Sequence, residues 1–399
     1  MSAHLANRQS SQEVNLFFAT RPGQIRNIAT YVSQAGRVNN RLVVLTTENE
    51  DRLRPKLAQA IPPGLFEYIG WPILPGAPSE RKGVFRRVKV YRVFESAIDE
   101  ALAFQESVAC VRVHLFHPSA YYPYVLRILA RRGVEVVGTV MLEEGISTYK
   151  WCALPYEIDT YGRVAGVHGA RDAVVEIKDA LMPPQLRFGI LEHFDEGWFR
   201  FPDAMANARQ VSFGCLKHLE PNPIPMLDER LMPLVEGAPK ALFVGQRFGD
   251  CRCSIETTLA LLELLGCTEV LYKVHPMESA DVIDETLRET STRNCKVRVC
   301  RLPALDDAPV EALIATGHFS VVVGLTSTAL VYASQDSTNT RFISMAWAFL
   351  ELYPLFYERQ FGCEMPAGHL RQLQRDAEVF GGIVEDVEML GKRRLDTCL

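Results

Sequence analysis

Two adjacent carboxylates follow a long apolar run in this chain and are the first residues whose chemistry needs an explanation. Residues Val134–Leu142 predict a buried strand, and Glu143, Glu144 and Gly145 come directly after it. Crowding two carboxylates beside an apolar sheet raises the apparent pKa of the pair, which suits proton transfer near neutral pH. A helix N-terminus, where acids favour the positive end of the dipole and glycine permits the turn, explains the same residues. Both interpretations stay open from these residues alone.

A histidine lies at a second predicted strand end. The apolar run Leu271–Val274 meets His275, and Pro276 biases this histidine toward an extended backbone. An imidazole at this position could hold a phosphate group and deliver a proton. The pair His117-Pro118 follows another predicted strand, and composition alone does not rank the two. A histidine that only bonds a backbone carbonyl explains either pair.

Hydroxyl side chains gather at a third predicted strand end. The apolar strand Ser320–Val323 is followed by Gly324, and Thr326, Ser327 and Thr328 come next. Donors at a strand-to-helix turn can bind a phosphate at the helix N-terminus, although an ordinary N-cap is an alternative. The GxxxxGK[ST] spacing of a triphosphate loop is missing here, and no GxGxxG follows the first strand of either half. ATP, GTP and NAD are therefore not indicated.

Short β-branched and aromatic runs alternate with amphipathic stretches, as expected for a parallel sheet covered by helices. In the first half, strands are predicted at Val14–Phe18, Leu42–Thr46, Phe66–Ile69, Val111–Phe116 and Val134–Leu142, with helices such as Val88–Phe104 and Tyr121–Arg132 between them. From about Trp151 to Glu236 the pattern loses its period, and prolines and aromatic residues interrupt it. This stretch is predicted to be an irregular end of the first domain and a linker.

A second series of alternating elements begins at Ala241 and predicts another doubly wound α/β domain. Its strands are predicted at Ala241–Val244, Glu269–Val274, Lys296–Leu302, Ser320–Val323 and Arg341–Met345, and its helices at Ile255–Leu265, Ala280–Glu289, Val310–Thr316 and Ser327–Ser334. The expected domains are residues 1–236 and 237–368, followed by a helical tail, 369–399, that packs back on the first domain. In open α/β sheets ligands bind beyond the carboxyl ends of the strands, where the three groups above are expected.

Composition limits the classes of protein to consider. With 399 residues, 48% of them hydrophobic, the chain can bury two cores of ordinary size. A net charge of -5 without a long run of like charges argues against binding to nucleic acid. The polar N-terminus and the lack of a run of about 20 apolar residues predict a cytoplasmic protein. The spacing of Cys251 and Cys253 is shorter than in structural zinc sites, so no metal site is expected.

The three groups have complementary chemistry. The first domain offers carboxylates without a phosphate-binding turn, and the second offers a histidine and a hydroxyl-rich turn. This division suits the transfer of a group from a phosphate-linked donor, held by the second domain, to a hydroxyl activated by the first.

In their order and their domains, these motifs resemble those of the bacterial sialyltransferases, especially the polysialyltransferase-like group. That family shares a D/E-D/E-G motif, an HP motif and a late Ser/Thr pair, which match Glu143-Glu144-Gly145, His275-Pro276 and Ser327-Thr328 here. The segment Ser147-Thr148-Tyr149 looks closest to the polysialyltransferase-like members. The resemblance also selects His275 over His117, because the HP motif of the family lies in the nucleotide-binding domain.

The resemblance implies a GT-B fold, in which two doubly wound, Rossmann-like α/β domains face each other across a cleft. It implies an inverting, metal-independent glycosyltransferase that moves sialic acid, or a related nonulosonic acid, from a CMP-activated donor to a glycan hydroxyl. The glycan is expected to be a bacterial surface polysaccharide or lipooligosaccharide, and no cofactor is implied beyond the CMP-sugar co-substrate. A metal is not needed, because a protonated histidine and several hydrogen-bond donors can stabilise the negative charge of a monophosphate leaving group.

The resemblance also implies roles for individual residues. Glu143 is expected to be the base, with Glu144 orienting the loop or binding acceptor, and the two could exchange these roles. His275 is expected to be the acid or a phosphate ligand. The further donor-binding residues are expected to be Pro276, Gly245, Gln246, Thr326, Ser327 and Thr328.

Acceptor contacts are expected from Gly145 and from Arg21 and Gln24, which follow the first strand and which a plain turn explains equally well. A basic segment could bind an anionic acceptor such as a sialylated glycan, or the anionic inner face of a membrane. It contains Arg81, Lys82, Arg86, Arg87, Lys89 and Arg92. A solvated helix face explains these side chains too.

Three other functions stay open. The first is a transferase of the same class that uses a different donor, for example CMP-Kdo. A nucleotide-sugar epimerase of similar two-domain shape would handle a UDP diphosphate, for which no basic or glycine-rich cradle is evident in the sequence. A non-catalytic glycan-binding or assembly protein would keep the scaffold, although the retention of acid, histidine and hydroxyl groups together argues against it.

Overall fold

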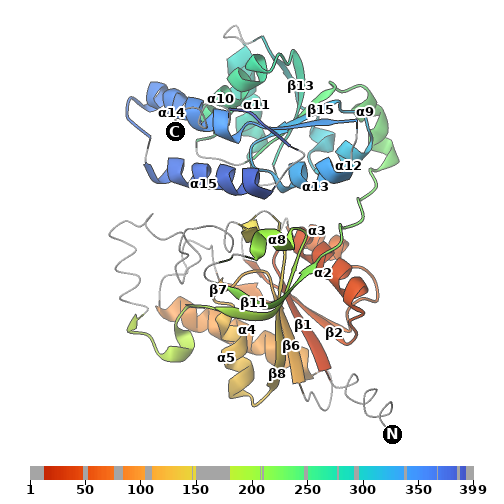
Figure 1. Cartoon of the computed structure of the whole chain (residues 1–399), viewed down its shortest axis with the longest axis vertical. Coiled ribbons are helices and arrows are strands. Elements are labelled where there is room, and N and C mark those ends of the chain that lie inside the picture. The colour runs from red at the N-terminus through yellow and green to blue at the C-terminus, as the bar shows by residue number, and fades with distance from the viewer. Residues whose placement is uncertain are drawn as a thin grey trace. The chain divides into compact units, whose positions relative to one another are not determined.

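The computed structural model divides into two compact units, Met1–Asn222 and Pro223–Leu399 (Figure 1). The structure describes residues 13–47, 53–75, 84–103, 110–145, 147–149, 180–206, 208, 211–246, 250–275, 278–291, 296–336, 339–365, 367–383 and 387–391. Three residues singled out above, Arg81, Lys82 and Pro276, lie outside these ranges. The division falls at 222/223, whereas the sequence predicted a boundary at 236/237.

The first unit is built, within its described residues, on a seven-stranded sheet in the order β11-β10-β8-β6-β1-β2-β4, and all neighbouring strands are parallel. The strands are β1 (Glu13–Ala19), β2 (Asn40–Val44), β4 (Tyr68–Gly70), β6 (Cys110–Leu115), β8 (Glu135–Leu142), β10 (His193–Phe199) and β11 (Ser212–His218). Two short pairs accompany them, β3 (Thr46–Thr47) with β5 (Ile73–Leu74) and β7 (Ser119–Ala120) with β9 (Gly189–Ile190). The strand order reverses between β1 and β6, which makes this unit doubly wound as predicted.

Helices of the first unit follow its strands and bring polar side chains to the ends of the sheet. They are α2 (Pro22–Ala35), α3 (Leu53–Ala60), α4 (Val84–Ala103), α5 (Pro123–Arg131) and α8 (Pro202–Met205), together with the 3-10 turn η2 (Pro184–Leu186). Helix α2 can begin directly after β1, because Pro22 suits a first turn and the Gln24 side chain accepts from the Arg21 backbone N–H (3.2 Å). It ends at Gly36, whose φ of 60° favours a residue without a side chain.

The region that the sequence left irregular contains two strands of this sheet. The prediction for Trp151–Glu236 is wrong at β10 and β11, which are paired with each other, and β10 is also paired with β8. The sequence of β10, HFDEGWF, hides the strand because Asp195 and Glu196 occupy its middle. Acidic residues inside a sheet need partners of opposite charge, which a local pattern does not reveal.

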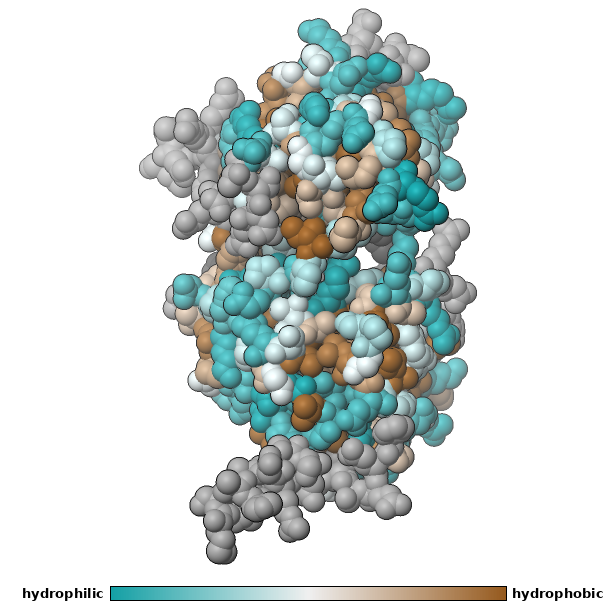
Figure 2. All heavy atoms as spheres, turned by 90° about the vertical axis from the view of Figure 1, so that its right-hand side faces the viewer, coloured by the Kyte–Doolittle hydropathy of each residue, from teal (hydrophilic) through white to brown (hydrophobic). Residues whose placement is uncertain are grey.

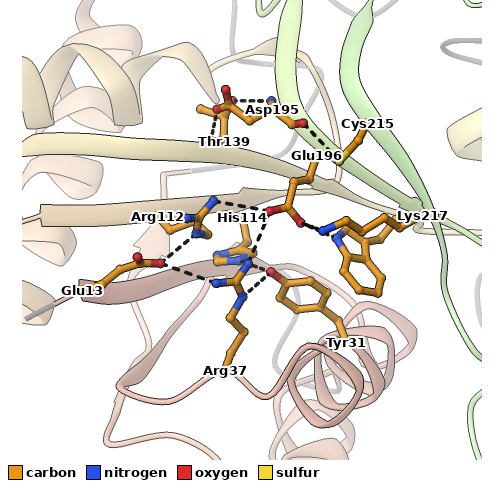
Figure 3. A network of polar contacts seen from close by, with 11 residues as sticks. Glu13, Tyr31, Arg37, Arg112, His114, Thr139, Asp195, Glu196, Cys215 and Lys217 are labelled. Carbon is orange, nitrogen blue, oxygen red and sulfur yellow. Dashed lines mark hydrogen bonds and ion pairs between the residues drawn. The ribbon is translucent and has the colours of Figure 1, made fainter. Parts of the chain in front are cut away.

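A charged network supplies those partners (Figure 3). The Glu196 carboxylate lies 3.4 Å from Arg37, 3.6 Å from Arg112 and 3.0 Å from Lys217. Burial acts to raise the pKa of Glu196, but hydrogen bonds from Trp198 and Lys217 and the nearby cations bring it below its usual value. The network joins Arg37, just after the end of α2, to β6, β10 and β11. It thereby fixes the position of α2 on the sheet.

The second unit contains, in its described part, a six-stranded parallel sheet in the order β14-β13-β12-β15-β16-β17. The strands are β12 (Ala241–Val244), β13 (Glu269–Lys273), β14 (Arg298–Cys300), β15 (Val321–Gly324), β16 (Arg341–Ser344) and β17 (Glu388–Met389). The helices are α9 (Met232–Glu236), α10 (Cys251–Leu264), α11 (Ala280–Ser291), α12 (Val310–Ala315), α13 (Thr328–Asp336), α14 (Ala346–Phe361) and α15 (Ala367–Ile383), with the 3-10 turns η3 (Glu229–Leu231) and η4 (Pro303–Leu305). Its strand order reverses between β12 and β15.

The last helix and strand belong to the second unit by their contacts. Helix α15 packs against α14, and β17 pairs with β16. Ala377 and Phe380 of α15 are fully buried. In the described residues, this stretch extends the second sheet and its helical layer, and packing of the tail on the first domain stays a prediction.

The surface drawn in Figure 2 is mainly hydrophilic, with apolar patches on both units. Within the described parts of the chain, no helix is both long and apolar enough to cross a lipid bilayer. Several large apolar side chains are nevertheless exposed, among them Phe85 and Leu181 in the first unit and Met226 and Leu264 in the second. Scattered exposed apolar residues are normal, so their surroundings decide whether they matter.

Candidate active site

Glu143 is a buried residue at the end of β8. It has no exposed surface, and its Oε2 accepts hydrogen bonds from the Tyr149 hydroxyl (2.5 Å) and the Arg200 backbone N–H (2.6 Å). The Tyr149 hydroxyl in turn accepts from the Phe201 N–H (3.0 Å). These bonds orient the carboxylate and tie the ends of β8 and β10 together.

Glu144 lies next to Glu143 but in a different environment. It is partly exposed, and burial raises the pKa of its carboxyl, although the Arg21 guanidinium and a hydrogen bond from Gln24 act in the opposite direction. Its backbone N–H donates to the Thr148 hydroxyl (2.7 Å) across the turn at Gly145, whose φ is 133°. A carboxylate with a raised pKa beside a cation is suited to proton exchange near neutral pH.

The start of α2 completes this site. The Oε1 of the buried Gln24 accepts from the Arg21 backbone N–H, and its amide group bonds Glu144. One turn further, the Asn27 side chain donates to the Glu143 carbonyl (2.5 Å). The fold thus brings Arg21 and Gln24 to the carboxylate pair, which the sequence could not distinguish from a plain turn.

Arg86 and Arg87 make structural contacts on α4. Arg87 is only 1% exposed, and its guanidinium lies 4.1 Å from the centroid of the Phe188 ring. Arg86 donates to the Pro75 carbonyl (2.5 Å). These contacts hold α4 to its surroundings and give no support to the expectation that the two arginines bind acceptor.

In the second unit, Gln246 and Thr326 connect two strand ends at the point where the strand order reverses. The Gln246 amide N–H donates to the Thr326 hydroxyl, and the Thr326 backbone N–H donates to the Gln246 amide oxygen, both at 2.9 Å. Thr326 is buried, so the pair forms a fixed floor between β12 and β15. In doubly wound sheets, ligands bind at this reversal point.

His275 follows β13, the strand next to β12, and Glu278 holds its backbone. The His275 N–H donates to the Glu278 carboxylate (2.7 Å), and the Glu278 N–H donates back to the His275 carbonyl (2.9 Å). The Tyr272 hydroxyl donates to the other carboxylate oxygen of Glu278 (3.1 Å). A Cβ on Gly245 would lie 2.5 Å from this carboxylate, so the residue after β12 must be glycine for reasons of space.

Two more hydroxyls lie at the start of α13. The Ser327 hydroxyl accepts from the Ala329 N–H (3.3 Å), and Thr328 is the first residue of the helix. Both side chains belong to partly exposed residues. They follow β15, so the hydroxyl turn, Gln246 and His275 come after three neighbouring strands of one sheet. In doubly wound sheets this edge is where ligands bind.

The two His-Pro pairs lie in different units. His117 follows β6 of the first sheet, and its ring centroid lies 6.4 Å from that of Tyr122. His275 belongs to the second unit, on a strand end next to Gln246. The fold therefore associates His275 with the hydroxyl turn, and His117 with the first unit.

Comparison with known sequences identifies the family. The sequence model of the alpha-2,8-polysialyltransferase (POLYST) family matches residues 15–346. The chain belongs to this family. The match confirms the resemblance to polysialyltransferase-like bacterial sialyltransferases, and the chain is a glycosyltransferase. No curated protein matches it.

Solved structures similar to this polysialyltransferase-family chain have low sequence identity to it. LpCGTa in complex with UDP is 12% identical, with a TM-score of 0.47 over 92% of this chain and 90% of that one. UDP-GlcNAc 2-epimerase from Neisseria meningitidis, bound to UDP-GlcNAc, is 11% identical, with a TM-score of 0.44 over 97% and 99% of the two chains. A glycosyltransferase from Rickettsia africae is 9% identical, with a TM-score of 0.44 over 96% and 97%. The predicted fold class, α/β of GT-B type with two doubly wound units, is confirmed.

Three contributors to these sites in the polysialyltransferase-family chain were not predicted. Glu278 had a signal, because it lies three residues after His275, a spacing at which a side chain can reach back to a backbone N–H. Asn27 lies one turn after Gln24 and could have been found once α2 was placed on this edge. Arg200 gave no signal, because no strand was predicted before it.

Proposed function

We propose that this chain transfers sialic acid, or a related nonulosonic acid, from a CMP-activated donor to a hydroxyl of a bacterial surface polysaccharide or lipooligosaccharide. The family match supports this class of reaction. The observation that carries the proposal is the carboxylate pair after β8, where Glu143 is held by Tyr149 and Arg200 and Glu144 has a raised pKa. Such a pair suits removal of a proton from an acceptor hydroxyl.

The second unit is proposed to hold the donor. A phosphate at the ends of β12, β13 and β15 would meet the Ser327 and Thr328 hydroxyls and the imidazole of His275. Thr326, Gln246 and Gly245 shape the floor of this site, and Pro276 is proposed to keep the backbone of His275 extended. These groups can stabilise a departing CMP without a divalent cation.

In the proposed reaction, the acceptor oxygen attacks the anomeric carbon on the side opposite the phosphate, which inverts the configuration. The new carbon–oxygen bond forms while the bond to the phosphate oxygen breaks, and that electron pair leaves with CMP. His275 donates a hydrogen bond or a proton to the departing phosphate, and a carboxylate of the first unit takes the proton of the acceptor hydroxyl. This step requires the two units to face each other across a cleft.

The base is proposed to belong to the Glu143–Glu144 pair, and two assignments follow. In the first, Glu143 takes the proton, and Tyr149 and Arg200 fix its carboxylate for that task. In the second, the partly exposed Glu144 takes the proton, and Glu143 positions the turn that carries it. Arg21 and Gln24 contact Glu144 in either case and are proposed to lie near the acceptor together with Gly145.

Release of CMP tests the proposal. The full-length protein is incubated with CMP-sialic acid, with and without glycan acceptors, and free CMP is measured. Acceptor-dependent CMP release with formation of a sialylated product is the expected result. Release from CMP-Kdo instead would change only the donor. Turnover of a UDP-sugar without CMP release would replace the proposal with an epimerase, and binding of glycan without turnover would replace it with an assembly protein.

A further inference from the structure

Apolar and basic side chains share one face of the first half of α4. Phe85, in the first turn, is 86% exposed. Lys89 and Arg92 are also exposed, and their spacing of four and seven residues places them on the same side of the helix as Phe85. The beginning of α4 thus presents an aromatic ring next to two cations.

The acidic side chains of α4 lie in its second half, and two of them are paired. Glu95 forms ion pairs with Arg131 and Arg132, which follow one another at the end of α5. Arg132 also donates to Asp99, with its Nε 2.9 Å from Oδ1. These pairs neutralise Glu95 and Asp99, and the third acid, Glu100, lies two turns beyond Arg92, so the positive charge of Lys89 and Arg92 has no acidic neighbour in the first half of α4.

A turn before η2, closed by hydrogen bonds, exposes a further apolar residue. Leu181 is 81% exposed, while the next residue, Met182, is buried. The Arg187 guanidinium closes the turn with hydrogen bonds to the Met182 carbonyl (2.8 Å) and the Ala180 carbonyl (2.9 Å). The following η2 contacts both α4 and α5, and Figure 1 shows this yellow-green segment beside the orange α4. Leu181 is therefore held outward by ordered contacts.

We propose that this surface, the α4 face, docks the first unit on an anionic lipid surface. It consists of Phe85, Lys89 and Arg92 on α4, and of Leu181 and Arg187 on either side of η2, which contacts α4. Exposed aromatic and aliphatic side chains can insert at the acyl boundary of a bilayer, and nearby cations can bind the lipid phosphates. Apolar insertion alone or electrostatic attraction alone gives only weak binding. A free polyanionic glycan would use the cations, but it offers no apolar partner for Phe85 and Leu181. The combination favours lipid.

Flotation with vesicles tests this proposal. The full-length protein is mixed with vesicles of phosphatidylcholine, with or without phosphatidylglycerol, at low and high salt. Binding is expected only with phosphatidylglycerol and should weaken with salt. The double variant Lys89→Glu/Arg92→Glu should lower the partition coefficient by about tenfold or more. Phe85→Ser/Leu181→Ser should also lose binding, without loss of thermal stability or of turnover on a short soluble acceptor.

A matched control uses two exposed apolar residues of the second unit, Met226 (91% exposed) and Leu264 (75% exposed). Met226→Ser/Leu264→Ser should bind vesicles like the wild type. Equal binding to both kinds of vesicle, binding to neither, or full binding by Phe85→Ser/Leu181→Ser would overturn the proposal. An unchanged vesicle affinity of Lys89→Glu/Arg92→Glu, together with a higher KM for an anionic acceptor, would assign the face to acceptor instead. The vesicle measurement does not depend on the donor, so it stands apart from the test of CMP release.

Discussion

The carboxylate site of the first unit and the histidine and hydroxyl site of the second both follow the carboxyl ends of parallel strands, but different contacts hold them. Glu143 is fixed by side chains and backbone from segments far apart in sequence, such as Asn27 and Arg200. In the second unit, His275 is held by Glu278, only three residues away, and Gln246 is paired with Thr326 across neighbouring strands. The first site is thus held together by contacts between segments distant in sequence, and the second by tight turns at the ends of neighbouring strands.

This difference predicts that changes in the first site act mainly on proton transfer. Replacing the base by its amide should lower kcat by about 10²–10⁴-fold, the usual contribution of general base catalysis, without a change in the affinity for CMP. Glu143→Gln and Glu144→Gln are compared by steady-state kinetics over pH. The variant that removes the acidic limb of the pH–rate profile identifies the base.

Tyr149→Phe is the control, because it removes one hydrogen bond to Glu143 and leaves both carboxylates in place. It should reduce kcat less than the amide variant of the base does. Nearly wild-type rates in both glutamine variants would move the base away from this pair.

The second largest effect is expected at the histidine of the second unit. His275→Asn should lower kcat by about 10²-fold, because the leaving phosphate loses its acid or its hydrogen-bond donor. The matched variant His117→Asn, in the first unit, should change kcat little. Rates of CMP release measure both, and a greater loss at His117 would assign the role at the leaving phosphate to His117 instead of His275.

The tight turns of the second site predict that added volume there is costly. In Gly245→Ala the new methyl group would lie 2.5 Å from the Glu278 carboxylate and 2.7 Å from the Lys273 carbonyl. Overpacking of this kind should lower the free energy of unfolding by about 1–3 kcal/mol and weaken CMP binding. In Gly237→Ala the nearest atom lies at 3.5 Å, so this control should unfold at nearly the wild-type urea concentration. Equal midpoints for the two variants would remove the steric argument.

The smallest effect concerns the pH dependence of stability at the first site. Burial raises the pKa of Glu144 in the folded chain, so the folded state holds this proton more tightly than the unfolded state. The resulting stability is complete below the unfolded pKa and is lost as pH rises through the folded pKa. Glu144→Gln should therefore melt at a higher temperature than the wild type at neutral pH, and this advantage should disappear in acid. Glu135→Gln, at the exposed start of β8, is the control in thermal melts and should show no such gain.

Much of the fold could be predicted from the sequence where strands are short apolar runs between turn residues. All five strands predicted from Ala241 onward are present, and most of their residues in β12, β13, β15 and β16 are buried, so their apolar runs stand out in the sequence. In contrast, β10 was missed because it carries Asp195 and Glu196, whose partners come from other elements. The final stretch is predicted to be helical, and α15 is present there, but a local pattern does not show the surface on which a helix packs.

The site could be predicted as a set of residue types, but not as a set of contacts. Arg21 and Gln24 were assigned to the acceptor side from their place after the first strand, and the fold brings both to Glu144. Arg87 was assigned to the same side from its charge, yet it is buried against Phe188. The sequence shows which charge a side chain carries. Burial in the folded chain determines whether that charged group can contact a ligand.

The sequence by itself determined the alternation of strands and helices, the reactive residues after the strands, and the family. These properties depend on neighbouring residues, because periodic burial and short motifs are local. Only the tertiary structure decided that Tyr149 and Arg200 hold Glu143, that Glu144 has a raised pKa, and that Gly245 is needed for space beside Glu278. Hydrogen bonds, desolvation and steric exclusion act over a few ångströms, and folding alone brings residues that are distant in sequence within that range.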